Sequence, residues 1–288
     1  MKTLTGLLAL LIFLVCFSGC AMQSPSHWQD ARPDLQTPES EALAQEARLL
    51  YEVATDRERL LSSIAAFERV LAKNPGDYAT LTALSNQYIL LGTAYTARRA
   101  EKSHHFNQAM RFAELAMYSN AAFKQRVAAG TPLWDATGVL DKAQAEAMFF
   151  WVTALQYDFK EGMSLVAKIV NVRWMQHSLK FLDRIEQVAP GFGGGGVEFA
   201  KVICYYVLPK SMGGSESEGD AYMKRSIARS DGWLLPRWGR GKYYYVINGE
   251  TGKSRADLEW VASRNIEDFK DPMAWKVHFQ ANAKELLK

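Results

Sequence analysis

From about Ser40 to Lys288, apolar residues recur at the spacing of an amphipathic helix, and charged residues fall between them. Leu179, Leu182 and Ile185 illustrate this spacing in the segment "SLKFLDRIEQV". Nowhere does the chain alternate apolar and polar residues in the manner of a half-buried β-strand. The pattern therefore predicts an all-α domain over residues 40–288.

Proline and capping residues predict where these helices begin and end. Six prolines fall at expected helix boundaries, where a missing N–H and a fixed φ are tolerated: Pro75, Pro132, Pro190, Pro209, Pro236 and Pro272. Thr55-x-x-Glu58 has the spacing of a capping box and predicts the start of a helix that continues to about Lys73. Ser254-x-x-Asp257 is a weaker form of the same signal.

Part of the helical pattern has the spacing of a tetratricopeptide (TPR) repeat. In "DYATLTALSNQYILLG", Leu81, Leu84, Ser85, Tyr88 and Gly92 match the large and small positions of the first helix of such a repeat. Helices before and after this segment continue the pattern in increasingly divergent form. We expect a stack of about four divergent TPR-like helix pairs, because stacked repeats bury faces that single pairs leave exposed. A plain helical bundle would give part of the same pattern.

Two glycine-rich segments predict turns rather than a cofactor loop. Gly191, Gly193 and Gly196 have G-x-G-x-x-G spacing, but a dinucleotide loop must follow a buried strand, and here a helical pattern leads in. We expect a tight reversal at this glycine cluster and a second turn over residues 213–219, "GGSESEG". The glycines assigned to these two turns are Gly193, Gly194, Gly195, Gly196, Gly213 and Gly214.

The first residues of the chain predict export. A basic residue and an apolar run lead to "FSGC", and the run has the length of a signal-peptide core but is too short to span a bilayer. The ending resembles a bacterial lipobox, which predicts a lipoprotein-type signal peptide at residues 1–19 and lipidation of Cys20. Cleavage without a lipid and an uncleaved anchor are the alternatives. Residues 20–39, which have no apolar period, are expected to form a flexible tether.

Cysteine usage and charge exclude further classes. Cys16 leaves with the signal peptide, Cys20 carries the lipid and Cys204 stands in an apolar helix, so no disulfide forms within the mature chain. The formal net charge of +3 over 288 residues gives no indication of a nucleic-acid partner. The segment "PRWGRGKYYYV" (residues 236–246) has rings and cations that could stack on bases. Aromatic residues at a repeat interface explain it equally, and export argues against nucleic acid.

No complete catalytic or metal-binding motif is present in the sequence. His104 and His105 form the one histidine cluster, and no Cys or carboxylate stands at the spacing that would complete a zinc site. There is no G-x-S-x-G motif, and the carboxylates are scattered over polar helix faces. We therefore expect no enzymatic activity, no cofactor and no metal.

Aromatic residues make up 12% of the chain and gather in a few segments. Most of these rings are expected in the core. Others are expected to line an apolar cavity between stacked helix pairs, where a lipophilic ligand binds. The candidates are Phe149, Trp151, Trp174, Tyr205 and Tyr206.

The order of these features resembles that of one family. The glycine cluster is followed by an apolar helix, Pro209, a Gly-Gly turn and a helix that contains Ala221 and Ile227. With "NPGDYATLTALSNQYILLG" and the lipobox, this order resembles the TRAP-transporter-associated TPR lipoproteins, the T component of those systems. The likeness covers most of residues 40–250. It departs at "GGSESEGDAY", which is longer than the short Gly-Gly-Asp turn expected there.

The resemblance implies an extracytoplasmic accessory protein of a TRAP-type solute uptake system. Such a protein would be anchored by its lipid in the bacterial envelope, facing the periplasm, and Ala21 after the lipidated cysteine favours the outer membrane. It would bind the solute-binding subunit (the P component) and a lipophilic or amphipathic organic acid, and the resemblance also suggests a homotrimer. The alternative is a TPR lipoprotein scaffold that assembles envelope complexes and carries no small ligand.

Overall fold

The computed structural model describes residues 26–288, so the predicted signal peptide and Cys20 lie outside the described residues. Within this range every regular element is a helix, which confirms the all-α prediction. The α-helices are α2 (Pro38–Glu52), α3 (Arg57–Lys73), α4 (Tyr78–Ala94), α5 (Arg99–Met117), α6 (Ala121–Ala128), α7 (Leu133–Ala136), α8 (Ala145–Tyr157), α9 (Leu165–Asn171), α10 (Trp174–Val188), α11 (Gly196–Val207), α12 (Glu216–Ala228), α13 (Leu235–Gly239), α14 (Tyr245–Ile247), α15 (Thr251–Ser263) and α16 (Met273–Leu286). Two π-helical segments, η3 (Asp158–Gly162) and η5 (Arg240–Tyr244), and four 3₁₀ turns, η1 (Thr137–Val139), η2 (Lys142–Gln144), η4 (Lys210–Met212) and η6 (Ile266–Asp268), complete the set.

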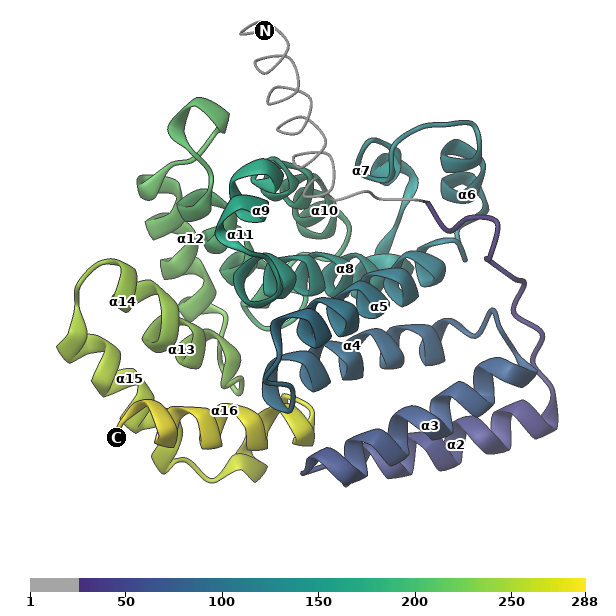
Figure 1. Ribbon diagram of the computed structural model, residues 1–288, viewed down its shortest axis with the longest axis horizontal. Helices are drawn as coiled ribbons and strands as arrows, with labels where there is room; N and C mark the ends of the chain where they lie inside the picture. The colour runs from purple at the N-terminus through teal and green to yellow at the C-terminus, as the bar shows by residue number, and fades with distance from the viewer. Residues whose placement is uncertain (1–25) are drawn as a thin grey trace, which may run out of the picture.

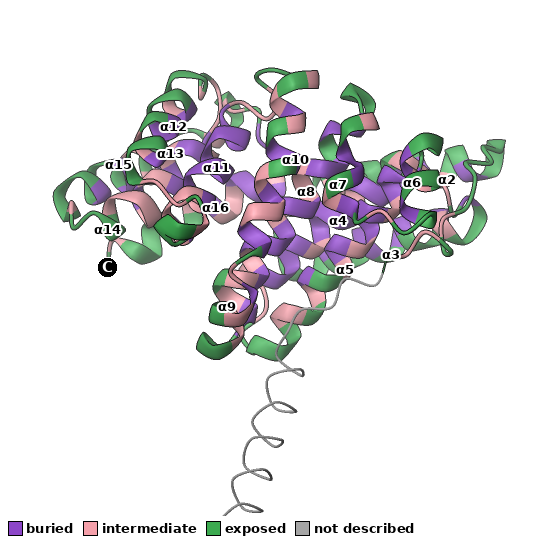
Figure 2. Cartoon of the chain, turned by 90° about the horizontal axis from the view of Figure 1, so that it is seen from above, coloured by how far each residue is buried: buried purple, intermediate pink, exposed green. Residues whose placement is uncertain are grey.

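The helices pack in pairs along an arc (Figure 1). α2 packs against α3, α4 against α5, α8 against α10, α11 against α12, and α15 against α16. These pairs are joined because α3 contacts α4, α5 contacts α8, and α10 contacts α11. Buried residues are concentrated in the middle of the stack, on α4 and α8 (Figure 2). The predicted stacking of helix pairs is therefore confirmed.

Small residues bring α4 and α5 together. The Ser85 hydroxyl donates to the carbonyl oxygen of Ala109 across the pair, at 2.8 Å. Gly92 lies directly against the ring of Phe106, so that a Cβ at this position would overlap the ring. The small positions of the repeat pattern thus allow close helix contact, and buried residues of both helices belong to one hydrophobic core.

The C-terminal helix closes the arc. α16 packs on α15 and also contacts α4 and α2, as its position at the bottom of Figure 1 shows. Its Trp275 donates through Nε1 to Asn86 Oδ1 on α4, at 2.6 Å. This contact joins residues 189 positions apart and places α16 beside the middle of the stack.

Several predicted boundaries were wrong in detail. α3 is capped by Asp56, whose carboxylate accepts from the Arg59 N–H, and not by Thr55. Ser254 lies inside α15, where its hydroxyl donates to the Gly241 carbonyl oxygen at 2.6 Å, so it caps nothing. The second glycine turn is short, because Ser215 caps α12 and the residues after it are already helical.

The part of the predicted tether that the structure describes lies against the helical body. The His27 ring contacts the carboxylate of buried Glu114 at 2.8 Å. The Leu35 N–H donates to Asn74 Oδ1 at 2.8 Å, and Lys124 donates to the carbonyl oxygen of Ala31 at 3.1 Å. Residues 26–37 are therefore held by the body, a correction to the flexible-tether prediction. In residues 26–288, no helix combines the length and apolar character needed to cross a membrane.

Candidate functional site

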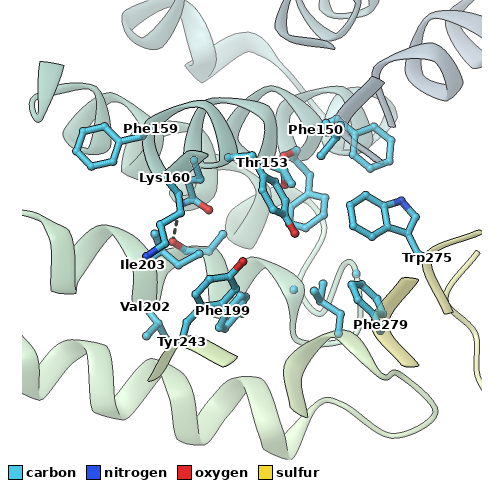
Figure 3. Close-up of a pocket in the computed structure, with 18 of the residues that line it drawn as sticks. Phe150, Thr153, Phe159, Lys160, Phe199, Val202, Ile203, Tyr243, Trp275 and Phe279 are labelled. Atoms are coloured by element: carbon cyan, nitrogen blue, oxygen red, sulfur yellow. Dashed lines mark hydrogen bonds between the residues drawn. The ribbon is translucent and has the colours of Figure 1, made fainter. Parts of the chain in front are cut away.

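A cavity of about 490 Å³ lies among α4, α8, α11, α16 and the two π-helical segments (Figure 3). We call it the apolar cavity, because aromatic and aliphatic side chains form most of its wall. Its rings include Phe149, Phe150, Phe199, Tyr243, Trp275 and Phe279. Walls of this kind, with few polar groups, are typical of sites for lipophilic molecules.

α8 and α11 supply the two long walls. α8 is apolar on most sides, so it buries Trp151 in the core while Phe149 and Thr153, four residues apart, face the cavity. α11 places Phe199 and Ile203 on the opposite wall with the same spacing. Two helices that are apolar on more than one face can therefore pack in the stack and also line a cavity.

Both π-helical segments contribute to the cavity wall. η3 continues α8 and η5 follows α13, and each widens the helix to i→i+5 hydrogen bonds. The extra residue in each turn changes the direction of the side chains that follow. Here the two segments bring Phe159, Lys160, Tyr243 and Tyr244 to the cavity. π-helical turns occur frequently at functional sites.

The glycine turn between α10 and α11 forms one end of the cavity, where Gly193 and Gly196 are lining residues. Gly194 and Gly195 have positive φ, 54° and 91°. A Cβ on Gly194 would overlap the ring of Trp233, and a Cβ on Gly195 would overlap the backbone carbonyl of Ser226. The glycines thus allow a left-handed turn and a close approach of backbone to its neighbours.

Most polar groups in the wall already have partners. Gln156 donates to the carbonyl oxygen of Ala200 at 2.8 Å. Asp271 accepts from the Leu234 N–H at 2.7 Å, which ties the start of α16 to the start of α13. These groups hold the walls together. The charged side chains that also line the cavity are Glu146, Lys160 and Lys168.

Two lysines lie at one end of the cavity. Lys160 on η3 is exposed, and Lys168 on α9 donates to the Lys160 carbonyl oxygen at 2.8 Å. Burial lowers the pKa of Lys168, and the nearby cations Lys160 and Arg99 lower it further. A carboxylate at this end would relieve that repulsion, so the cavity suits an apolar molecule with an acidic head.

Exposed apolar residues flank this end on two short helices. We call α9 and α14 the mouth helices, because Lys168 of α9 and Ile247 of α14 both line the cavity. Leu165 is 74% exposed, Ile169 67% and Ile247 64%. In Figure 2, α9 projects from the body with exposed and half-buried residues along it. Exposed apolar groups gathered beside a cavity are typical of a contact surface.

The structure separates the five predicted channel residues. Phe149 and Tyr206 are among the lining residues of the apolar cavity. Trp151 and Trp174 are instead core residues, 2% and 4% exposed, and their rings lie 6.2 Å apart. Tyr205 stacks on Tyr222 at 5.5 Å, in a small cluster between α11 and α12. These three pack the protein and are not among the residues that line the cavity.

Sequence reasoning missed the rings of α16 and η5. Tyr243 and Tyr244 belong to "PRWGRGKYYYV", a segment whose aromatic and basic composition was the available signal. Trp275 and Phe279 of α16 gave no such signal, because four-residue spacing is ordinary for a packed helix. They reach the cavity because α16 returns to α4.

The remaining sequence candidates have structural surroundings. Cys204 is fully buried, and burial raises the pKa of its thiol to about 12, so it stays protonated at neutral pH. The His104 and His105 rings lie 5.7 Å apart. Within residues 26–288, no three His, Cys, Asp or Glu side chains are close enough together to hold a metal ion. In comparisons with protein-family models and with curated proteins, nothing matches this sequence.

Proposed function

We propose that this protein binds a lipophilic or amphipathic organic acid in the apolar cavity. We further propose that it is a lipid-anchored, periplasm-facing accessory protein of a TRAP-type uptake system, which contacts the solute-binding subunit. The apolar cavity of about 490 Å³, bordered at one end by Lys160 and Lys168, carries this proposal. The lipobox and the family resemblance of the sequence support the choice of system.

The cavity supports the ligand chemistry in two ways. Its half-buried rings, such as Phe149, Phe150 and Tyr243, border the cavity, and covering them with an apolar chain would remove hydrophobic surface from water. Its cations stand at one end, where an acid group of the same molecule would meet them. An amphipathic acid satisfies both conditions at once.

The mouth helices support the partner contact. Leu165 and Ile169 form an exposed apolar face beside the cavity, and a globular partner seated there would meet the opening through which a ligand passes. The lipid on Cys20 would keep the complex at a membrane, where lipophilic solutes collect.

Filling the cavity tests the ligand proposal. Thr153 faces the cavity from α8 (Figure 3), so Thr153→Trp places an indole in the space. Binding of a fluorescent fatty acid, followed by titration, is expected to be lost in this variant. Thr251→Trp, at the exposed start of α15, is the matched control and is expected to bind as the unaltered protein does. Equal binding by both variants would exclude the cavity as the site.

Purification from the native membrane tests the partner proposal. The lipidated protein is isolated in mild detergent, and the retained proteins are identified by mass spectrometry. We expect a periplasmic solute-binding protein to be retained in constant ratio. It should be lost in the double variant Leu165→Glu/Ile169→Glu and kept in Leu49→Glu, a control at another exposed apolar site. Outer-membrane assembly proteins or cell-wall enzymes in its place would favour the scaffold and contradict the uptake function.

A further inference from the structure

A second pocket, polar in character, lies behind the walls of the apolar cavity. It has a volume of about 510 Å³, and we call it the polar pocket. Its side chains come from the end of α4, the α4–α5 connection and α5, from both π-helical segments, and from α16. Because these elements are distant in sequence, the pocket exists only in the folded stack.

The two pockets share three walls. Lys160 lines the apolar cavity and Glu161, the next residue of η3, lines the polar pocket. On η5, Tyr243 lines the apolar cavity and Lys242 the polar pocket. On α16, Phe279 and His278 divide in the same way. Figure 3 shows Tyr243 and Phe279 on the apolar side.

The charges of the polar pocket are unbalanced. Arg99, Lys102 and Lys242 stand against one carboxylate, Glu161. That carboxylate is already engaged, since Lys102 donates to its Oε2 at 2.5 Å and Thr93 donates to its Oε1 at 3.0 Å. One ion pair therefore leaves two cations of the pocket without a counterion in it.

Lys242 is the cation most enclosed by the pocket. Among residues 26–288 its ammonium forms no ion pair or hydrogen bond, and it lies over the rings of Trp238 and Tyr243 at 4.5 and 5.1 Å. Burial lowers the pKa of Lys242 to about 8; the Glu161 carboxylate acts in the opposite direction, and the smaller contributions of Lys102 and Lys160 lower the pKa. A half-buried ammonium without a counterion is costly unless an anion binds beside it.

Two neutral side chains, His278 and Asn282, line the same pocket as this ammonium. His278 has a buried Nε2 without a hydrogen-bond partner among the described residues. Burial, with the nearby Lys242 and Lys102, lowers the pKa of His278 to about 3, so the ring is neutral and carries one N–H donor. Asn282 accepts from Trp238 Nε1 through its Oδ1 at 3.2 Å, which leaves its NH₂ group as a donor.

We propose that the polar pocket binds a small anion with carboxylate or phosphate oxygens, with Lys242 as its principal contact and Arg99, His278 and Asn282 around it. This site is separate from the apolar cavity and does not depend on which molecule occupies that cavity. Since η3, η5 and α16 carry residues of both sites, an anion in the polar pocket would hold three walls of the cavity in place.

Titration calorimetry at constant ionic strength, with inorganic phosphate and with succinate, tests this proposal. Saturable binding of at least one of them is expected at neutral pH, and the preferred probe distinguishes a phosphate from a carboxylate ligand. In Lys242→Met, affinity is expected to fall about tenfold or more, as for loss of a charge-assisted contact. Lys224→Met on the exposed face of α12 is the matched control and is expected to bind as the unaltered protein does.

Lys168→Met separates the two pockets, because Lys168 lines only the apolar cavity. Loss of anion binding in Lys168→Met but not in Lys242→Met would overturn the proposal, as would binding of neither probe. Failure of fatty-acid binding would leave this result unaffected, so the two proposals fail separately.

A second measurement guards against a folding defect in Lys242→Met. Without anion this variant is expected to melt at a temperature equal to or higher than the unaltered protein, because an unpaired half-buried cation is gone. Added phosphate or succinate is expected to raise the melting temperature of the unaltered protein only.

NMR of the Lys242 ammonium is expected to show that its pKa rises when the anion binds. The charged groups that act on this pKa are Glu161, Lys102, Lys160 and Glu285. Arg99 and the neutral ring of His278 line the same pocket. An unchanged pKa at saturating probe would contradict the proposal.

Discussion

The helix pairs at the N-terminal end and the helices around the apolar cavity are built from similar apolar sequences but fill space differently. Between α4 and α5, Ser85 and Gly92 let the partner helix come into direct contact. Between α8, α11 and α16, buried and half-buried rings border an open volume of about 490 Å³. The two regions differ in their backbone. Near the cavity, the π-helical segments η3 and η5 and the glycine turn before α11 direct rings toward a space that α16 encloses.

Matched phenylalanine truncations should give the largest contrast. Phe67 on α3 is 2% exposed in the packed end, so Phe67→Ala is expected to cost about 3–5 kcal/mol of unfolding free energy. Phe149 is half-buried and already borders the cavity, so Phe149→Ala is expected to cost roughly 1–2 kcal/mol. Chemical denaturation measures both values. Equal losses would mean that the cavity wall is packed as tightly as the core.

Helical periodicity and the small positions of α4 were sufficient to predict the helices and their pairing. The void was harder to predict, because no residue pattern distinguishes a π-helical turn from an α-helical one at η3 or η5. The return of α16 to α4 depends on Trp275 meeting Asn86 over 189 residues, a contact without a local signal. For the same reason the sequence could not separate lining Phe149 from buried Trp151, two positions further along α8.

Local capping was misjudged where adjacent residues compete for the same role. Thr55 and Asp56 can both accept a hydrogen bond from a first-turn N–H, and the structure selects Asp56. In "GGSESEG", serine and glycine suggested a long turn, yet Ser215 caps α12 and the glutamates that follow occupy its first turn. Acidic residues in a first turn are favourable beside the helix dipole, and that signal was available.

Asp158, the first residue of η3, is a buried carboxyl group that should make stability depend on pH. It is 3% exposed, and burial raises the pKa of its carboxyl from 3.8 to about 6. The folded protein therefore keeps a proton that the unfolded chain loses between these values. Its contribution to stability is full below pH 3.8 and is lost as the pH rises through about 6.

Asp158→Asn should remove this dependence, because an amide does not titrate. At pH 7 the variant is expected to be more stable, by on the order of 2–3 kcal/mol. The difference between the two proteins should shrink as the pH falls toward 4. Thermal denaturation at several pH values measures that difference, in which contributions from His177 and His278 cancel. A difference independent of pH would show that the carboxyl titrates normally.

The glycine turn at the cavity end should tolerate less change than the second one. Gly195 has φ of 91° and faces the Ser226 carbonyl, so Gly195→Ala combines backbone strain with overlap and is expected to cost roughly 2 kcal/mol or more. Gly213 has φ of 93° but open space around it, so Gly213→Ala carries the strain alone, about 1 kcal/mol. Equal losses in denaturation would mean that the approach to Ser226 contributes nothing.

The smallest effect on stability is expected at the mouth helices, where an apolar residue is exposed without packing. Ile169 on α9 is 67% exposed, so Ile169→Ala should change the unfolding free energy by less than about 0.5 kcal/mol. Ile64 on α3 is 4% exposed, and Ile64→Ala should cost about 2–4 kcal/mol. Capture of the proposed partner, a periplasmic solute-binding protein, should follow the opposite order. We expect Ile169→Ala to weaken it and the folded fraction of Ile64→Ala to retain it. If Ile169→Ala and Ile64→Ala capture the partner equally, per amount of folded protein, the exposed side chains of the mouth helices have no role in partner binding.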